Sequence, residues 1–358
     1  MVGAGPAGTA AAIRLRQHGV TVSVLERSMG PRARVGESVP AEIRAPLAEL
    51  GAWPAFCVQG HLESRGAASA WETPSLRRAD AWCSPLGGGW HLDRRAFESM
   101  LVQQAARAGA EIRAATTVVH IDTQGAGWRV HAVGATGRRE AMDARLLVDA
   151  TGRPAIVSRR LGARRCLQDR LVCAHAVFSA GSGAAELRTL VEAVEDGWWY
   201  ATPLPGQCSL AAFFTDAGML RTGNYGAAAS WHRALRRAVH VFDYVGRPRE
   251  PRDLRICAAS QHCLDRSAGN GWIAVGDAAS SRDPLSSAGL TLALRTGLNG
   301  GDAVSRDLAG DRDALNDHGY EVRRRFSRYL AQRAALYGVV QRWPDAPFWN
   351  RRPAYNGN

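Results

Sequence analysis

The stretch that decides the fold is GAGPAGTAAAIRLRQHGVTVSVLER, residues 3–27. A G-x-G-x-x-G turn leads into an alanine-rich helix that ends at Gly19, and a buried parallel strand then runs to Glu26 and Arg27. An acid about twenty residues beyond such a turn is typical of a dinucleotide-binding unit. We therefore predict a Rossmann-like α/β fold, with Glu26 accepting from ribose hydroxyls and Arg27 beside it at the cofactor.

Each residue of the turn has an expected role. Gly3 makes the tight turn, Gly5 lets the backbone approach a pyrophosphate, and Gly8 lets the helix pack closely on the sheet. Pro6 and Ala7 begin the helix, whose free N–H groups and positive dipole face the phosphates. The alternative is a glycine turn that holds no ligand.

The strand that should precede this turn is almost absent, since only Met1 and Val2 stand before Gly3. Such a strand is central in a doubly wound sheet and buried on both faces. Losing three large apolar side chains there forfeits roughly 5–9 kcal/mol of burial. We therefore expect the natural chain to begin several residues upstream.

Composition excludes several kinds of chemistry. The formal net charge is +12, and all 45 basic residues are arginine because the sequence contains no lysine. This excludes a Schiff base, a lysine general base and a Walker-type phosphate lysine. The arginines are scattered, so we expect no nucleic-acid binding. No apolar run approaches the ~20 residues that span a membrane. Seven cysteines without a C-x-x-C pair or metal spacing indicate no metal site and a cytoplasmic protein.

Two later segments repeat the pattern of a buried strand that enters a glycine turn. The first ends in Asp149-Ala-Thr-Gly152, and the second is Gly276-Asp277-Ala278, followed by Asp283-Pro284 and Gly289-Leu290. Together with the first turn, they resemble the FAD-binding pattern of the hydroxybenzoate-hydroxylase-like flavoproteins. This group includes aromatic monooxygenases, flavin-dependent halogenases and geranylgeranyl-reductase-like enzymes. The resemblance implies that FAD is the cofactor.

The resemblance also implies further cofactor contacts. Asp277 is expected to meet the ribityl or ribose hydroxyls, and Pro284 and Leu290 to contact the cofactor. The helix that starts near Gly289 points its N-terminus at the flavin ring. Two more residues, Ser38 and Arg94, should lie along the cofactor. For Arg94 the alternative is a surface arginine on a helix.

The chain divides into interleaved parts. We expect a Rossmann-like FAD-binding domain, a smaller mixed-sheet substrate domain and a C-terminal helical segment. The FAD-binding domain takes residues 1–60, 92–164 and 258–310, the substrate domain takes 61–91 and 165–257, and the C-terminal segment takes 311–358. We expect residues 60–92 to be largely irregular and the last helix to span 317–342, stopped by Trp343-Pro344.

Two departures argue against lysine-dependent halogenation. Segment 36–40 is similar to that of the halogenase and reductase branches, and segment 283–289 to that of the halogenases. However, those enzymes use an active-site lysine that this chain lacks. Their W-x-W-x-I-P motif is only approximated by residues 198–203, with Tyr200 in place of the second tryptophan and Thr202 in place of isoleucine.

The C-terminal stretch 329–352 resembles the flavoprotein maturases of cysteine tryptophylquinone enzymes, of the lysine-oxidase and glycine-oxidase type. The resemblance implies oxygen insertion into a tryptophan side chain of a partner protein. For Trp343, Phe348 and Trp349, we favour the alternative that they only anchor the C-terminus on the core.

The sequence thus predicts an FAD-dependent monooxygenase of an aromatic substrate, with a peptidyl tryptophan of a partner protein as the candidate. Two alternatives stay open: a flavin-dependent reductase of the geranylgeranyl-reductase type and a non-catalytic flavoprotein partner. The electron donor is NAD(P)H or a separate reductase. No catalytic residue is identified. His91, His175 and His262 can titrate near neutrality, but we favour a structural, hydrogen-bonded role for each.

Overall fold

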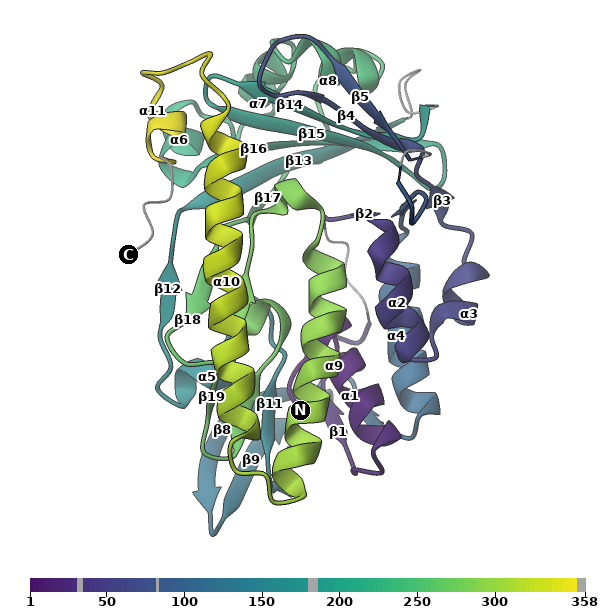
Figure 1. Cartoon of the computed structure of the whole chain (residues 1–358), viewed down its shortest axis with the longest axis vertical. Helices are drawn as coiled ribbons and strands as arrows, with labels where there is room; N and C mark the ends of the chain where they lie inside the picture. Colours follow the sequence, from purple (N-terminus) through teal and green to yellow (C-terminus); the bar gives the residue numbers. More distant parts are fainter. Residues whose placement is uncertain (31–34, 82–83, 180–185, 353–358) are drawn as a thin grey trace.

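Two large β-sheets lie one above the other along the long axis of the protein (Figure 1). The structure is a computed structural model that describes residues 1–30, 35–81, 84–179 and 186–352. In that part of the chain, no helix is long and apolar enough to cross a membrane. The predicted α/β class is confirmed, with a Rossmann-like sheet, a mixed sheet and a long C-terminal helix.

The lower sheet carries the dinucleotide motif. Val2 bridges Leu25 and Asp149 in parallel and so joins two short ladders into one sheet. Its strands in spatial order, with Val2 between β1 and β11, are β7 (Glu111–Arg113), β1 (Ser23–Leu25), β11 (Leu147–Asp149), β20 (Trp272–Ala274) and β19 (Ala268–Gly269). The central strand position is thus taken by the first residues of the chain. The expected upstream start remains a prediction.

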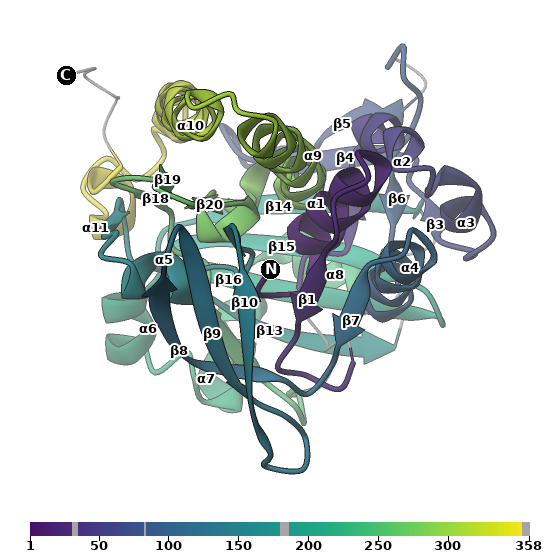
Figure 2. The same cartoon turned by 90° about the horizontal axis from the view of Figure 1, so that it is seen from below.

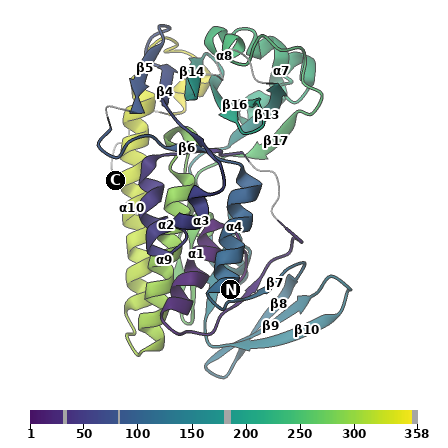
Figure 3. The same cartoon turned by 90° about the vertical axis from the view of Figure 1, so that its right-hand side faces the viewer.

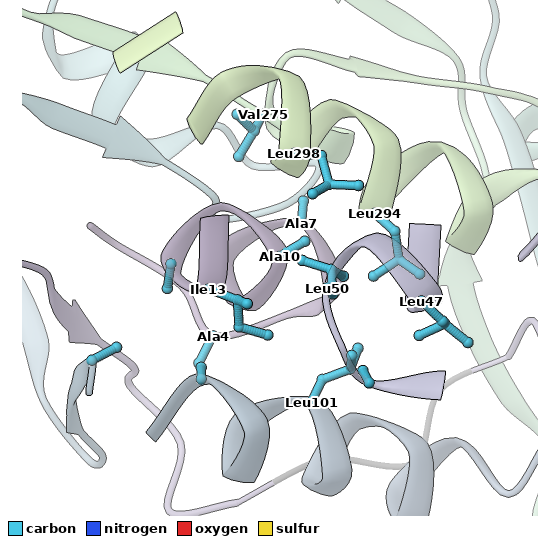
Figure 4. Packing of buried hydrophobic residues seen from close by; sticks show 14 of the residues in the cluster. Ala4, Ala7, Ala10, Ile13, Leu47, Leu50, Leu101, Val275, Leu294 and Leu298 are labelled. Atoms are coloured by element: carbon cyan, nitrogen blue, oxygen red, sulfur yellow. The ribbon is translucent and has the colours of Figure 1, made fainter. Parts of the chain in front are cut away.

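Helices cover one face of this sheet (Figures 1 and 4). They are α1 (Pro6–Gln17), α2 (Arg44–Glu49), α4 (Arg94–Arg107) and α9 (Gly289–Leu308), with α10 (Ala314–Gly338) beside α9. Helix α1 approaches α9 very closely, since a Cβ on Gly297 would stand 2.3 Å from the Ala7 carbonyl oxygen. In Figure 4, Ala7 and Ala10 of α1 point toward Leu294 and Leu298 of α9.

A three-stranded antiparallel sheet covers the other face (Figure 2). It consists of β8 (Thr117–Gln124), β9 (Gly127–Val133) and β10 (Arg139–Ala144). Val118 and Val130 belong to the same apolar cluster as Leu147 and Trp272 of the parallel sheet. The parallel strands are therefore buried from both sides, which is what their apolar sequences require.

The upper sheet is mixed and has seven strands (Figure 3). Their spatial order is β17 (Arg255–Ala258), β13 (Leu171–Ser179), β16 (Cys208–Asp216), β15 (Gly197–Leu204), β14 (Arg188–Val194), β4 (Gly66–Ala70) and β5 (Arg77–Asp80). Helices α7 (Ala228–Leu235) and α8 (Val239–Tyr244) pack on one face of the sheet. Trp231 of α7 meets Trp199 edge-on, with ring centroids 4.9 Å apart. The other face packs against the C-terminal segment.

Short elements connect the two sheets. One small sheet joins β2 (Ser38–Val39), β6 (Trp90–His91) and β3 (Leu62–Glu63), and another joins β12 (Arg165–Leu167), β18 (His262–Leu264) and β21 (Ser280–Ser281). The remaining short helices are α3 (Trp53–Cys57), α5 (Ile156–Arg160), α6 (Ala217–Thr222) and α11 (Pro347–Asn350). The division of the chain into domain ranges stays a prediction.

Two expectations about local structure were wrong in part. Residues 60–92 are not irregular throughout, because four strands, β3 to β6, fall within this range and β4 pairs in parallel with β14. The helix expected at 317–342 spans Ala314–Gly338, so it begins earlier than expected and ends before Trp343 and Pro344.

The C-terminal aromatic residues anchor the chain end. Phe348 is fully buried, and the Trp349 indole N–H donates to the Val194 carbonyl oxygen at 3.1 Å. Trp343 is partly buried and stacks on Trp349 with ring centroids 6.1 Å apart. The favoured interpretation of these three side chains therefore agrees with the structure.

Candidate functional site

A cavity of about 970 Å³ lies between the two large sheets. This volume is at the upper end of the range of small-molecule and cofactor sites. The expected cofactor contacts that line it are Gly3, Gly5, Pro6, Ala7, Glu26, Arg27, Ser38, Arg94, Asp277, Pro284, Gly289 and Leu290. One long site thus gathers residues from both ends of the chain.

The glycine turn has the geometry expected of it. Gly3 has φ +105°, and a Cβ there would stand 2.2 Å from the Ala150 carbonyl oxygen. Gly8 does not line the cavity, because its α-carbon packs against Gly3, whose carbonyl oxygen would stand 2.1 Å from an added Cβ. A Cβ on Gly5 would meet no protein atom within 4 Å. The open space is therefore at the one glycine expected to face a pyrophosphate.

Backbone amides hold the Glu26 carboxylate beside this turn. Oε2 accepts from the Ala4 amide and Oε1 from the Ser28 amide, both at 2.9 Å. Glu26 is half-buried in the cavity wall, whereas Arg27 is exposed at its rim. The carboxylate is thus held in place where the adjoining ribose of a dinucleotide would lie.

Arg94 is buried and is not the surface arginine of the alternative interpretation. Its side chain is 10 % exposed, and its guanidinium donates to the carbonyl oxygens of Val35 (3.1 Å) and Gly36 (2.8 Å) and to Glu98 (2.5 Å). Its Nε is buried and has no partner in the described part of the chain. Asp93 caps the N-terminus of α4, because its side chain accepts from the backbone amides of residues 95 and 96.

The late motif begins beside the glycine turn, since a Cβ on Gly276 would stand 2.5 Å from the Ala7 Cβ. Helix α9 begins at Gly289 without a side-chain cap, so its first amides point toward the cavity. Asp277 accepts from the Arg153 Nε at 3.3 Å and remains partly exposed in the cavity wall. Two helix N-termini, those of α1 and α9, therefore face one cavity, an arrangement suited to a ligand with anionic groups at separate places.

A polar network that sequence reasoning missed surrounds Ser38. Its Oγ lies 3.0 Å from His91 Nδ1 and from Thr202 Oγ1, and it accepts from the Tyr200 hydroxyl at 2.8 Å. His91 is fully buried, and its Nε2 donates to the Leu187 carbonyl oxygen at 3.1 Å. Burial lowers the pKa of His91 to about 4 and raises the pKa of Tyr200, so both groups are neutral at pH 7.

We expect the free energy of unfolding to fall as the pH drops from about 6.5 toward 4. The unfolded chain protonates His91 near its ordinary pKa of 6.5, whereas the folded state does so only at about 4. The contribution of the neutral His91 to stability is therefore complete above the unfolded-state pKa of 6.5, and it is lost as the pH falls through the folded-state pKa of about 4. The loss from His91 at pH 4.5 is on the order of 2–3 kcal/mol. Urea unfolding at pH 7.5 and 4.5 measures it.

The H91Q variant should lose less stability than the wild type between these two pH values, because glutamine does not titrate. H120Q removes an exposed histidine and should retain the full wild-type loss. An equal loss in wild type and H91Q would contradict the assignment.

Aromatic side chains form the wall of the cavity under the upper sheet. Trp198, Tyr200 and Phe214 line it, and Trp198 stacks on Phe214 with ring centroids 4.0 Å apart. Trp199 points to the opposite face of β15, as strand alternation requires. The Trp198 indole N–H donates to the Tyr337 hydroxyl at 2.9 Å, which ties the wall to α10.

The histidine candidates divide into two kinds. His262 is buried against Ser281, with Nδ1 2.8 Å from the hydroxyl, and burial lowers its pKa to about 4. His91 is likewise buried, hydrogen-bonded and lowered in pKa. The contacts of His91 and His262 therefore agree with the structural role favoured for them. His175 lines the cavity instead.

Comparison with known proteins decides the family. The tryptophan halogenase profile matches residues 55–354, and an NAD(P)-binding Rossmann-like domain profile matches residues 1–47. The chain belongs to the tryptophan halogenase family. The expected FAD cofactor and oxidoreductase class are thereby confirmed, as is the predicted resemblance.

Several relatives of this tryptophan halogenase family member match nearly its whole length. LodB of Marinomonas mediterranea, named as an FAD-dependent oxidoreductase, is 28 % identical over 366 residues, covering 99 % of this chain and 96 % of LodB. The myxobacterial chondrochloren halogenase CndH superposes with a TM-score of 0.91 at 24 % identity, covering 100 % of this chain and 86 % of CndH. The peptidyl tryptophan dihydroxylase QhpG superposes with a TM-score of 0.82 at 25 % identity, covering 99 % of this chain and 79 % of QhpG.

The residues of this tryptophan halogenase family member fit FAD. The open side of Gly5 leaves a cradle that a side chain would fill, and the buried Arg94 Nε has an unmet hydrogen-bonding capacity in the cavity wall. The uncapped start of α9 adds free amides on the far side. These features suit a long ligand with a central pyrophosphate and a ring system that accepts hydrogen bonds.

Proposed function

We propose that this protein is an FAD-dependent monooxygenase that inserts oxygen into a tryptophan side chain of a partner protein. The observation that carries the proposal is the aromatic wall of Trp198, Tyr200 and Phe214 in a cofactor cavity of a chain without lysine. Such a wall suits an electron-rich ring, while the lysine that serves halogenation in relatives is missing.

We propose that the chain holds FAD along the cavity in one orientation. The pyrophosphate lies at the start of α1 against Gly5, the adenosine ribose at Glu26, and the ribityl chain near Asp277. The flavin ring lies between the start of α9 and the aromatic wall. When bound, FAD supplies the reducing electrons and the activation of oxygen, so the protein need not provide a metal.

The side chains around the ring position a substrate and exclude water. The phenolic proton of Tyr200 is held in a hydrogen bond to the Ser38 Oγ, and the neutral His91 lies behind it. The network therefore presents no net charge to the cavity, and an indole can enter beside Tyr200 without displacing a hydrated ion.

The printed name of one relative, QhpG, supports a protein substrate. QhpG is described as a peptidyl tryptophan dihydroxylase essential for tryptophylquinone cofactor biogenesis, and its identity to this chain extends over almost the whole length. The positive charge of +12 favours an acidic partner surface. NAD(P)H or a separate reductase remains the proposed electron donor.

The test is direct oxygenation. The FAD-loaded protein is reduced and incubated in air with a precursor subunit of a tryptophylquinone enzyme. The expected result is a gain of about 16 Da for each inserted oxygen, located on one tryptophan by peptide mass spectrometry. The same subunit with that tryptophan replaced by phenylalanine should gain no oxygen.

Adding bromide to the same reaction distinguishes halogenation from oxygenation. A gain of bromine in place of oxygen would identify a halogenase and overturn the proposal. Consumption of reductant without peroxide, with two hydrogens gained per reduced double bond of a supplied isoprenoid and no oxygen gained by the subunit, would favour a reductase.

A further inference from the structure

Two cysteines far apart in the sequence stand opposite each other in the cavity wall. Cys173 of β13 and Cys257 of β17 are directly paired in the antiparallel register. The Ala259 amide donates to the Leu171 carbonyl oxygen at 3.0 Å. Ladder alternation therefore makes 173/257 a hydrogen-bonded pair, whose α-carbons are about 5.5 Å apart. This spacing is close to that preferred by disulfides, roughly 5.5–6 Å.

The two thiols differ in access. Both line the cavity, but Cys257 is exposed to it, whereas Cys173 is only 1 % exposed. A small reagent can thus reach the Cys257 sulfur, whereas the Cys173 sulfur is buried next to it in the sheet. This is the arrangement of an attacking thiol and a resolving thiol.

The surroundings favour a reactive Cys257. A hydrogen bond from Cys173 and the neighbouring His175 lower the pKa of the Cys257 thiol to about 5, and Arg153 acts in the same direction. His175 lies on the same face of β13, and its Nδ1 is buried without a partner among the described residues. The other charged groups facing this pair are Glu37, whose charge opposes ionisation of Cys173, and Arg255 on β17.

We propose that Cys173 and Cys257 form a redox-active dithiol that hydrogen peroxide converts to a disulfide inside the cofactor cavity. The Cys257 thiolate attacks one peroxide oxygen, the O–O bond breaks, and the departing hydroxide is protonated to water. The Cys173 thiol then attacks the sulfenic sulfur and releases a second water. Two thiols and one peroxide thus give one disulfide and two waters, with both electrons supplied by sulfur.

A second pair of cysteines in the chain serves as an internal comparison for the 173/257 pair. Cys166 of β12 and Cys263 of β18 are also directly paired, and the Asp265 amide donates to the Arg164 carbonyl oxygen at 2.9 Å, which gives them the same kind of ladder position. Neither lines the cavity. The ladder position alone would allow either cysteine pair to form a disulfide. Faster disulfide formation at the 173/257 pair would therefore show the effect of the cavity.

The experiment exposes the purified FAD-loaded protein to one equivalent of hydrogen peroxide at pH 7 and then blocks free thiols. Non-reducing peptide mapping should find a Cys173–Cys257 link that forms about tenfold faster than oxidation at the exposed Cys57. Equal rates at the 173/257 and 166/263 pairs, or no 173–257 link, would overturn the proposal.

Two variants distinguish the roles of the sulfurs. C173S should stop at a sulfenic acid on Cys257 that dimedone captures, and C257S should abolish the fast phase. C57S should behave as the wild type. Circular dichroism verifies that each variant is folded. Because the readout is the state of sulfur and not oxygenation of a substrate, failure here leaves the proposed monooxygenase function standing.

Discussion

A G5D variant is expected to fold normally and to lose FAD affinity by about 100-fold or more. A Cβ at this position meets no protein atom within 4 Å, and φ is −72°, which any residue adopts. The carboxylate would enter the space where we place the pyrophosphate and would oppose its charge at the start of α1. Titration of the apoprotein with FAD, followed by flavin fluorescence, measures the change.

A matched variant distinguishes a specific loss of FAD affinity from a general effect of placing an aspartate at an open glycine. Gly218 in the first turn of α6 also has open space around its α-carbon, but it does not line the cavity. G218D should therefore retain both wild-type stability and wild-type FAD affinity. If G5D binds FAD as tightly as G218D, the cofactor does not lie against α1 as proposed.

An R352A variant is expected to lose about 3–5 kcal/mol of unfolding free energy, because it leaves a buried carboxylate without its cation. Arg352 is 1 % exposed and donates to Asp216 at 2.6 Å, while Asp216 is 8 % exposed. Arg352 also donates to the Phe348 carbonyl oxygen at 2.7 Å, so one side chain links α11 to Asp216 of the upper sheet. Urea unfolding at pH 7.5 measures the change.

The neighbouring arginine supplies the control. Arg351 also approaches Asp216, at 3.4 Å, but its side chain is 61 % exposed. R351A should therefore cost less than about 1 kcal/mol, as for an ordinary surface ion pair. Equal costs in the two variants would mean that the buried pair does not anchor the C-terminus.

Local rules predicted the elements that position the cofactor. Helix α9 spans Gly289–Leu308, as expected, because its apolar period and flanking loop residues agree. The tight turn at Gly3 and the helix packing at Gly8 also have the expected geometry, since both depend on contacts within one short βαβ unit.

Features that depend on distant pairings could not be predicted from the sequence. Strand β5 is exposed along its whole length and shows no alternation that would identify it. The network of Ser38, His91 and Tyr200 joins three strands separated by long stretches of chain. The pairing of Cys173 with Cys257 depends on the register of two strands, which cysteine spacing does not encode.

The close contact of α1 with α9 has a consequence for the choice of ligand. An added carbon on Gly297, in the middle of α9, would collide with the Ala7 carbonyl oxygen, so the first turn of α1 contacts the middle of α9 backbone to backbone. Main-chain contact therefore fixes the relative placement of the two helices at which we propose that the pyrophosphate and the flavin ring bind. A dinucleotide of the wrong length cannot be accommodated by changing side-chain rotamers alone.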